Sequence, residues 1–316
     1  MGHGIAQTFA AAGMTVRCFD QLLEARQSLL PRVQANCQLL LRGGMIDRDA
    51  IDQITGHLVV CDSEQEALGD TQIVVEAVRE DLKVKRELLQ RIEAVVSPTC
   101  ILASNSSSFP MTQMAGGLQH PHRALNTHWF NPAHLCPLVE VVPGAHTAES
   151  MTAITIGLLE RAGKMPVRLH KELPGFLINR IQIAMSREVF DLVEKGVASC
   201  QDIDRAVRAS MGMRLAAAGP LKVWDFADLQ IVERVYELLV HEIRSDRKVP
   251  DLLRSLVAEG HRGFKSGHGF YDYPPEQRDA ELAQRDHRYL ELAKLLAGED
   301  SQQSTVDSRE SKGEDG

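Results

Sequence analysis

A histidine and a glutamate twelve residues apart are the side chains of this chain best suited to proton transfer. His128 ends an apolar stretch at 123–129, and Glu140 lies inside the apolar stretch 138–142. A carboxylate among apolar neighbours is costly to bury unless it is paired, and a histidine on a neighbouring segment is a natural partner. Such a pair holds one imidazole tautomer and raises its basicity, as a general base requires. The alternative is a structural histidine and an unrelated glutamate at a sheet edge.

Two further polar segments could bind a substrate oxygen. The serine-rich segment 104–108, which includes Ser107, follows a predicted strand. Loops at that end of a strand lie where ligands bind in open parallel sheets. Asn179 lies in the apolar first turn of a predicted helix, where its amide needs a hydrogen-bond partner. A plain connecting loop and a structural helix cap are the competing interpretations.

The first twenty residues match the second half of a dinucleotide-binding fingerprint. Gly2 and Gly4 open a predicted helix, and Asp20 ends the next strand, where a Rossmann fold binds the ribose hydroxyls of adenosine. A carboxylate there repels a 2′-phosphate and so favours NAD over NADP, although Asp20 could also be an ordinary turn residue. Gly2 corresponds to the third glycine of G-x-G-x-x-G. We therefore expect Met1 to be an internal methionine and the first strand of the fold to be missing.

The segments that would position these residues alternate between strand and helix patterns up to residue 172. Short apolar runs predict strands at 15–19, 58–61, 73–78, 100–103, 123–129, 138–142 and 166–169. Helical patterns lie at 21–42, 82–96 and 150–162. This alternation predicts an α/β fold with a doubly wound, mostly parallel sheet of the Rossmann type.

Strand signals nearly vanish after residue 175. Helical patterns follow at 176–194, 202–210, 232–247 and 249–259. We therefore expect a dinucleotide-binding domain at 1–172, an all-α domain at 173–298 and a disordered tail at 299–316. The expected tail is rich in Ser, Gln, Glu, Asp and Gly.

Composition and charge narrow the class of partner. The chain has 316 residues, of which 44% are apolar, and a formal net charge of −8, which argues against nucleic acid. Its six scattered cysteines contain no C-x-x-C pair and indicate reduced thiols in the cytoplasm. No apolar run reaches the ~18 residues of a membrane span. The sequence also suggests no metal site.

These motifs, taken in their order and spacing, resemble the L-3-hydroxyacyl-CoA dehydrogenase family from Gly2 to about Tyr273. The motifs that carry the resemblance are Met1 to Ala6, Val75 to Ala77, Ser104 to Ser108, His128 to Pro132, Leu138 to Val142, Pro174 to Arg180 and Lys265 to Tyr271.

The resemblance implies a role for each matching position. His128 would be the catalytic base, Glu140 would orient it, and Ser107 and Asn179 would contact the reacting oxygen. Residues lining the NAD site would be Gly2, Asp20, Glu80, Lys85, Ser107, Asn131 and Lys265. The all-α domain would bind substrate and form a homodimer.

The substrate class stays open between two branches of that family. Arg214 resembles the branch that contains lambda-crystallin, which is gulonate dehydrogenase, and an arginine suits a substrate carboxylate, although it could equally be a surface or interface residue. The stretch in which CoA-using members place a lysine carries Asn36 and Gly43 instead, with Arg32 or Arg42 as substitutes. The segments 265–271 and 128–132 look more like the hydroxyacyl-CoA branch.

The expected reaction is NAD-dependent oxidation of a short-chain 3-hydroxyacyl-CoA, such as 3-hydroxybutyryl-CoA, to the 3-oxoacyl-CoA in fatty acid metabolism. The alternatives are a dehydrogenase of a free 3-hydroxy acid, similar to gulonate or carnitine, and a truncated or non-catalytic member of the family.

Overall fold

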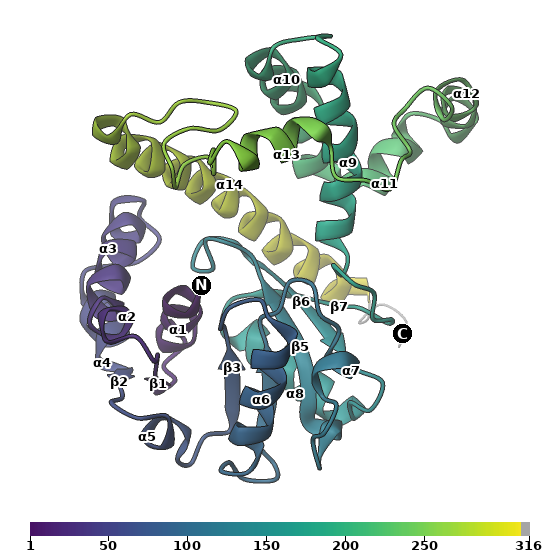
Figure 1. Cartoon of the computed structure of the whole chain (residues 1–316). Coiled ribbons are helices and arrows are strands. Elements are labelled where there is room, and N and C mark those ends of the chain that lie inside the picture. Colours follow the sequence, from purple (N-terminus) through teal and green to yellow (C-terminus); the bar gives the residue numbers. More distant parts are fainter. Residues whose placement is uncertain (311–316) are drawn as a thin grey trace. The chain divides into compact units, whose positions relative to one another are not determined.

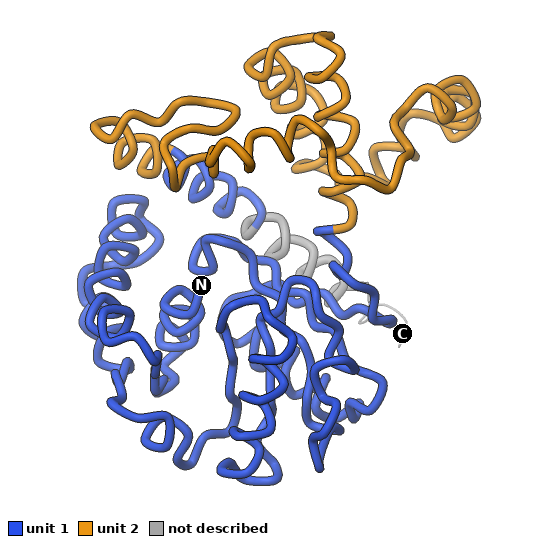
Figure 2. Tube along the Cα trace, in the orientation of Figure 1, with its two compact units in different colours: residues 1–179, 285–316 blue, residues 180–284 orange. Residues whose placement is uncertain are grey.

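The chain divides into two compact units in a computed structural model that describes the backbone of residues 1–310 and the side chains of residues 1–296. Unit 1 comprises Met1–Asn179 and the segment that begins at Arg285, and unit 2 comprises Arg180–Gln284 (Figure 2).

The strands of unit 1 form two sheets (Figure 1). Five strands, in the order β3-β4-β5-β6-β7, are β3 (Ile73–Glu76), β4 (Ile101–Ser104), β5 (Ala124–Trp129), β6 (Leu138–Pro143) and β7 (Met165–Arg168). A separate parallel pair joins β1 (Val16–Cys18) to β2 (Leu58–Val60). All pairs are parallel except β5 with β6. The prediction of a mostly parallel sheet is confirmed, with a strand at each of the seven predicted positions.

Helices of unit 1 pack against both of its sheets. They are α1 (Gly2–Ala11), α2 (Leu23–Gln27), α3 (Leu29–Arg42), α4 (Asp49–Gly56), α5 (Glu64–Leu68), α6 (Leu82–Glu93), α7 (Met111–Met114), the 3₁₀ turn η1 (Pro121–Arg123) and α8 (Glu149–Arg161). Ile101 and Leu125 pack with α1 and α8, whereas Leu102 and Ala124 pack with α6 and α7. Neighbouring residues of a strand point to opposite faces, so each strand contributes to both layers of the core.

The sequence predicts one long helix at 21–42, but the structure contains two helices there, α2 and α3. They meet at Ser28, whose hydroxyl donates a hydrogen bond to the carbonyl of Ala25. Serine hydroxyls that bond to the local backbone compete with regular helical hydrogen bonds, which accounts for the interruption.

Unit 2 is helical, as predicted. Its elements are most of α9 (Ile178–Glu194), α10 (Cys200–Val207), the π-helix η2 (Arg208–Gly212), α11 (Met213–Phe226), α12 (Leu229–Leu239), α13 (Asp251–Ala258) and the start of α14 (Pro275–Glu310). Helix α11 is kinked at Gly219, which has a positive φ of 72° and precedes Pro220. None of the helices that the structure describes is long and apolar enough to cross a membrane.

The division between the units differs from the expected boundaries at residues 172 and 298. Unit 1 extends to Asn179, and α14 leaves unit 2 and rejoins unit 1 at Arg285. Leu290 of α14 is only 1% exposed. A Cβ added to Gly43 would lie 1.9 Å from Leu290 Cδ2, so α14 packs directly on the end of α3. The disordered tail expected at 299–316 overlaps α14, whose backbone is helical to Glu310; residues 311–316 lie outside the described residues, and there the expected disorder stays a prediction.

The contact between Leu290 and Gly43 predicts that Leu290 stabilises unit 1. Leu290→Ala should lower the free energy of unfolding by about 2–5 kcal/mol, because it removes buried methyl groups and leaves a cavity. Urea unfolding followed by circular dichroism measures this loss. The matched control is Leu292→Ala, whose side chain is 49% exposed in the same helix and should change stability by less than about 0.5 kcal/mol. Equal losses in the two variants would contradict the anchoring role.

Candidate active site

His128 and Glu140 form a buried hydrogen-bonded pair in unit 1. They are directly opposite residues of the antiparallel strands β5 and β6. Their side chains are joined by a 2.7 Å bond between Nδ1 of His128 and Oε2 of Glu140. His128 is 3% exposed and Glu140 is fully buried. The structure thus brings together the two residues that the apolar flanking sequences singled out.

The second oxygen of Glu140 is held by the start of α9. Oε1 accepts hydrogen bonds from the backbone N–H groups of Leu177, at 3.1 Å, and Ile178, at 2.8 Å. The positive end of a helix favours a carboxylate, so α9 supports the charge of Glu140. Each oxygen of this carboxylate therefore has its own partner, and the carboxylate accepts from His128 only through Oε2.

A turn before α9 makes this arrangement possible. Gly175 and Phe176 both have positive φ values, 77° and 51°, and Phe176 is a rare non-glycine residue in this region. The Phe176 ring is buried and lies 5.5 Å from the His128 ring, while Phe130 lies 4.5 Å from it. The turn thus places the backbone donors on Glu140 and an aromatic wall beside the imidazole.

The serine-rich segment after β4 is held by Glu80. Oε1 of Glu80 accepts hydrogen bonds from the Ser106 hydroxyl at 2.6 Å, from the Ser107 N–H at 3.0 Å and from the Ser108 N–H at 2.9 Å. Partial burial raises the pKa of Glu80, but the bond from Ser106 and the charge of Lys85 outweigh it and leave the pKa below its usual value. Glu80 is therefore a charged anchor for the segment that carries Ser107.

Asn179 and Ser107 lie together in unit 1. Asn179 Nδ2 donates a 3.2 Å hydrogen bond to the backbone carbonyl of Ser107. Both side chains are half-buried. The two residues expected to contact the reacting oxygen are thus neighbours, although they are 72 positions apart in the sequence.

Lys85 lies between two carboxylates of unit 1. Its side chain is fully buried, and its ammonium lies 2.9 Å from Glu76 and 3.4 Å from Glu80. Glu76 also accepts a hydrogen bond from the Ser104 hydroxyl. In this structure Lys85 supports Glu80, and the direct cofactor contact expected of it stays a prediction.

Glu76 is a residue of this network to which the sequence had assigned no role. The sequence contains a signal for Glu76, because this acid ends the apolar run 73–76, just as Glu140 lies inside the apolar run 138–142. The apolar flanks of Glu76 are a signal of burial that the sequence analysis did not use, and they do not reveal that Lys85 and Ser104 are its partners.

Groups around α1 and β1 fit a dinucleotide. The first turn of α1 has no side-chain cap, and a free helix N-terminus suits a pyrophosphate. Nδ1 of His3 is buried and has no hydrogen-bond partner among the described residues. Asp20 is exposed at the end of β1, where its carboxylate accepts from the Leu22 N–H at 2.9 Å. These donors and this acceptor match the phosphate and ribose groups of NAD.

The two glycines at the start of α1 differ in how closely the rest of the chain packs on them. A Cβ on Gly2 would meet nothing within 4 Å, whereas one on Gly4 would lie 3.2 Å from the Cβ of Ala133. Gly4 therefore permits close packing of α1 on the segment after β5. Asn131 lies in that segment and is exposed.

Arg214 and Lys265 belong to unit 2, and both are exposed. Arg214 donates hydrogen bonds to Ser210, to the carbonyl at 3.5 Å and to the hydroxyl at 3.2 Å. The structure places neither residue relative to His128.

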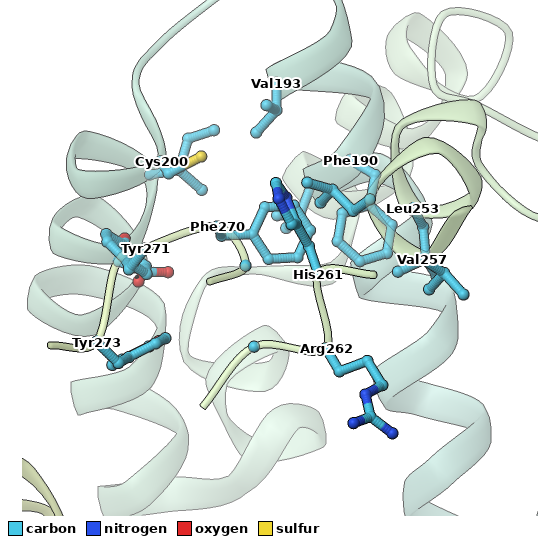
Figure 3. Close-up of a pocket in the computed structure, with 16 residues that line it drawn as sticks. Phe190, Val193, Cys200, Leu253, Val257, His261, Arg262, Phe270, Tyr271 and Tyr273 are labelled. Carbon is cyan, nitrogen blue, oxygen red and sulfur yellow. Dashed lines mark hydrogen bonds between the residues drawn. The ribbon is translucent and has the colours of Figure 1, made fainter. Parts of the chain in front are cut away.

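A cavity of about 470 Å³ lies within unit 2 (Figure 3). Phe190 and Phe270 stack in its wall at 5.4 Å, and Tyr271 donates to Asp204 at 2.7 Å. Burial, reinforced by this hydrogen bond, raises the pKa of Tyr271 to about 12. The cavity is mainly apolar, and none of the candidate site residues lines it. The acid–base chemistry of the described residues thus centres on unit 1.

Comparisons with known proteins identify the family of this chain. Residues 1–173 match the NAD binding domain of 3-hydroxyacyl-CoA dehydrogenase, and residues 175–273 match its C-terminal domain. A 5-formyl-3-hydroxy-2-methylpyridine 4-carboxylate 5-dehydrogenase of Mesorhizobium japonicum is 30% identical over 94% of this chain and 96% of its own length. A probable 3-hydroxybutyryl-CoA dehydrogenase of Bacillus subtilis is 34% identical, with 86% and 94% covered. An L-carnitine dehydrogenase of Streptomyces coelicolor is 36% identical, with 72% and 70% covered.

Solved structures show the same relationship. A crystal structure of the pyridine-carboxylate dehydrogenase, described as an NAD⁺-dependent dismutase, superposes with a TM-score of 0.88 at 30% identity and covers 94% of this chain and 96% of that one. The (S)-3-hydroxybutyryl-CoA dehydrogenase of Ralstonia eutropha superposes with a TM-score of 0.70 at 30% identity, with 87% and 95% covered. The resemblance seen in the sequence is confirmed: the chain belongs to the 3-hydroxyacyl-CoA dehydrogenase family of NAD-dependent oxidoreductases.

Proposed function

We propose that this protein oxidises the hydroxyl group of a 3-hydroxyacyl substrate, with His128 as the general base. The pairing of His128 with Glu140 is the observation that carries the proposal. Nδ1 of His128 is occupied by Glu140, and no described residue forms a hydrogen bond with Nε2. Nε2 is therefore the atom left to accept a proton.

Each of the four proposed catalytic residues has its own role in the reaction. His128 donates through Nδ1–H to Glu140 and accepts the hydroxyl proton at Nε2. Glu140 stabilises the imidazolium without taking its proton, because its oxygens are already held by His128 and by the start of α9. The Ser107 hydroxyl and the Asn179 amide stabilise the substrate oxygen as its charge develops.

Groups of unit 1 hold the cofactor in this proposal. Gly2 and Asp20 bind the adenosine half, and Glu80, Ser107 and Asn131 line the rest of the site. The cofactor role that the resemblance implies for Lys265 of unit 2 stays a prediction. When bound, NAD supplies the acceptor for the hydride that leaves the carbon bearing the hydroxyl. Lys85 acts indirectly, by holding Glu80.

A short-chain 3-hydroxyacyl-CoA, with 3-hydroxybutyryl-CoA as the first candidate, is the proposed substrate. The matches to both domains of 3-hydroxyacyl-CoA dehydrogenase and the similarity to 3-hydroxybutyryl-CoA dehydrogenases support it. This reaction would place the enzyme in fatty acid metabolism.

A free hydroxy acid is the second candidate. Asn36 donates to Gln7 at 2.8 Å and Gly43 lies under Leu290, so neither supplies a cation for a CoA phosphate. Arg214, by contrast, is exposed and could pair with a carboxylate. The relative whose structure superposes with a TM-score of 0.88 is named for a carboxylate substrate.

We also propose a cytoplasmic homodimer formed through unit 2. Leu221, Phe226 and Leu238 are 79%, 80% and 74% exposed on α11 and α12. Apolar side chains gathered at this level of exposure usually mark a protein interface. The six cysteines are all free, which suits a reducing compartment.

The proposed base predicts the effect of His128→Ala. Turnover should fall about 10²–10⁴-fold, which is the usual contribution of a positioned base. The equilibrium affinity for NAD should stay within about twofold, because the substitution removes a proton acceptor and not a proposed cofactor contact. Steady-state kinetics and calorimetry measure the two quantities. His122→Ala, an exposed histidine of unit 1, is the control; unchanged turnover in His128→Ala would refute the assignment.

Glu140→Gln tests whether Glu140 fixes the tautomer of His128 that carries its proton on Nδ1. The two backbone N–H groups of α9 require an oxygen, so the amide NH₂ of the glutamine would face Nδ1 of His128. Nδ1 would then have to accept, which moves the ring proton to Nε2 and blocks the base. Turnover should fall about as far as in His128→Ala, by about 10²–10⁴-fold. A pH–rate profile that matches the wild-type profile would argue against the pair.

A substrate comparison separates the two candidates. Wild type should turn over 3-hydroxybutyryl-CoA, and Arg214→Leu should leave that kcat/KM unchanged. If a free acid such as carnitine or gulonate is instead the better substrate, Arg214→Leu should raise its KM by about 10- to 100-fold, as expected for a lost charged hydrogen bond. Arg208→Leu, an exposed arginine of η2, is the matched control.

A further inference from the structure

Lys164 bonds to the segment that joins the two catalytic partners. It lies between α8 and β7, and its side chain is buried, with 9% of the residue exposed. Its ammonium donates to the carbonyls of Ala133, at 2.6 Å, and Cys136, at 2.9 Å. It also lies 5.6 Å from the centre of the Trp129 ring. All three partners belong to the segment 129–136, which follows His128 and leads to Glu140.

The buried charge of Lys164 does not contribute to the stability of the folded protein. Among the described side chains, no carboxylate lies within ion-pair distance of its ammonium. Burial lowers the pKa of Lys164 from 10.5 to about 8. Because the folded value lies below the unfolded one, folding opposes the protonated form, and stability should rise as the pH rises from about 8 to 10.5. A buried, unpaired cation of this kind is more typical of a functional site.

The segment that Lys164 holds also contacts the cofactor helix. Ala133 packs on Gly4 of α1, and the Trp129 ring lies edge-on to Phe9 of α1 at 5.6 Å. Within the segment, the N–H groups of Leu135 and Cys136 both donate to the carbonyl of Pro132. Lys164 therefore ties an irregular loop to α8 and β7 on one side, while α1 supports it on another.

We propose that Lys164 is a positioning residue of the active site, whose ammonium holds the segment 129–136 so that Asn131 can contact the cofactor beside His128. Lys164 itself touches neither substrate nor cofactor. The inference rests on the cofactor role proposed for Asn131.

The strength with which Lys164 holds the segment 129–136 should depend on pH, because it depends on whether Lys164 is protonated. The titratable groups that face it are Cys136 and His134, and Arg285 of α14 faces His134. Burial raises the pKa of the Cys136 thiol, and burial with the charges of Lys164 and Arg285 lowers the pKa of His134 to about 4. Both are therefore neutral near pH 8, where Lys164 loses its proton.

Hydrogen exchange of the NAD-free protein tests the proposal directly. In Lys164→Met at pH 7, the amides of Leu135 and Cys136 should exchange about tenfold faster or more, because two charge-assisted hydrogen bonds are lost. Wild type should show a smaller acceleration above pH 8, after correction for the intrinsic exchange rate, because the neutral amine still donates to both carbonyls but without the charge that strengthens these bonds. Lys164→Arg keeps its charge at every pH and should lack this alkaline step.

Calorimetric NAD binding provides the second measurement. The NAD dissociation constant of Lys164→Met should be about tenfold larger than that of wild type at pH 7, and it should not change between pH 7 and 9. The dissociation constant of wild type should rise as the pH rises across this range. The matched control is Lys83→Met, a lysine of α6 whose side chain is 84% exposed, which should match wild type in both measurements.

Each result bears on one claim. Unchanged exchange in Lys164→Met would overturn the proposal, and so would faster exchange with unchanged NAD affinity. Wild-type protein that binds no NAD would instead contradict the proposed cofactor contacts, since the exchange measurement does not need the cofactor. If Lys164→Met does not fold, the pH series of wild type and Lys164→Arg decides the question alone.

Discussion

The carboxylate of Glu140 is the interaction on which the active site depends. It is fully buried, so its charge is tolerable only because each oxygen has a hydrogen-bond partner. One oxygen bonds to His128 across the β5–β6 pair, and the other to the start of α9. A single charge therefore orients the imidazole and joins the sheet to the first turn of the helix that carries Asn179.

A second buried carboxylate organises the neighbouring strands in the same way. Glu76 ends β3 and pairs with Lys85, which in turn reaches Glu80 and so the serine segment after β4. Glu76, Ser104 and His128 lie at or near the carboxyl ends of the strands β3, β4 and β5, which are parallel to one another, and ligands bind at such ends in open α/β sheets. Charged groups are costly in such a place unless they are paired, so pairing defines the geometry that the chemistry requires.

Much of the fold followed from local patterns. Apolar runs located the strands that the structure describes, because a strand buried on both faces reads as an apolar stretch, as β4 does over Ile101–Ala103. The loss of strand signals after residue 175 located the helical unit. The return of α14 to unit 1 could not be anticipated, because an apolar face on a helix shows that it packs but not on which partner. Leu290 meets Gly43, which is almost 250 residues away in the chain.

The sequence by itself determined the positions of the strands of unit 1, the helical character of unit 2, the family, and the candidacy of His128 and Glu140. An acid between apolar residues signals burial wherever it occurs, and burial demands a partner. Only the tertiary structure decided who the partners are: Leu177 and Ile178 for Glu140, Glu76 for Lys85, and two loop carbonyls for Lys164. The physical reason is that most of these donors are backbone groups or long side chains. The positions of these groups depend on how segments far apart in the sequence pack together, and residue types alone do not reveal that packing.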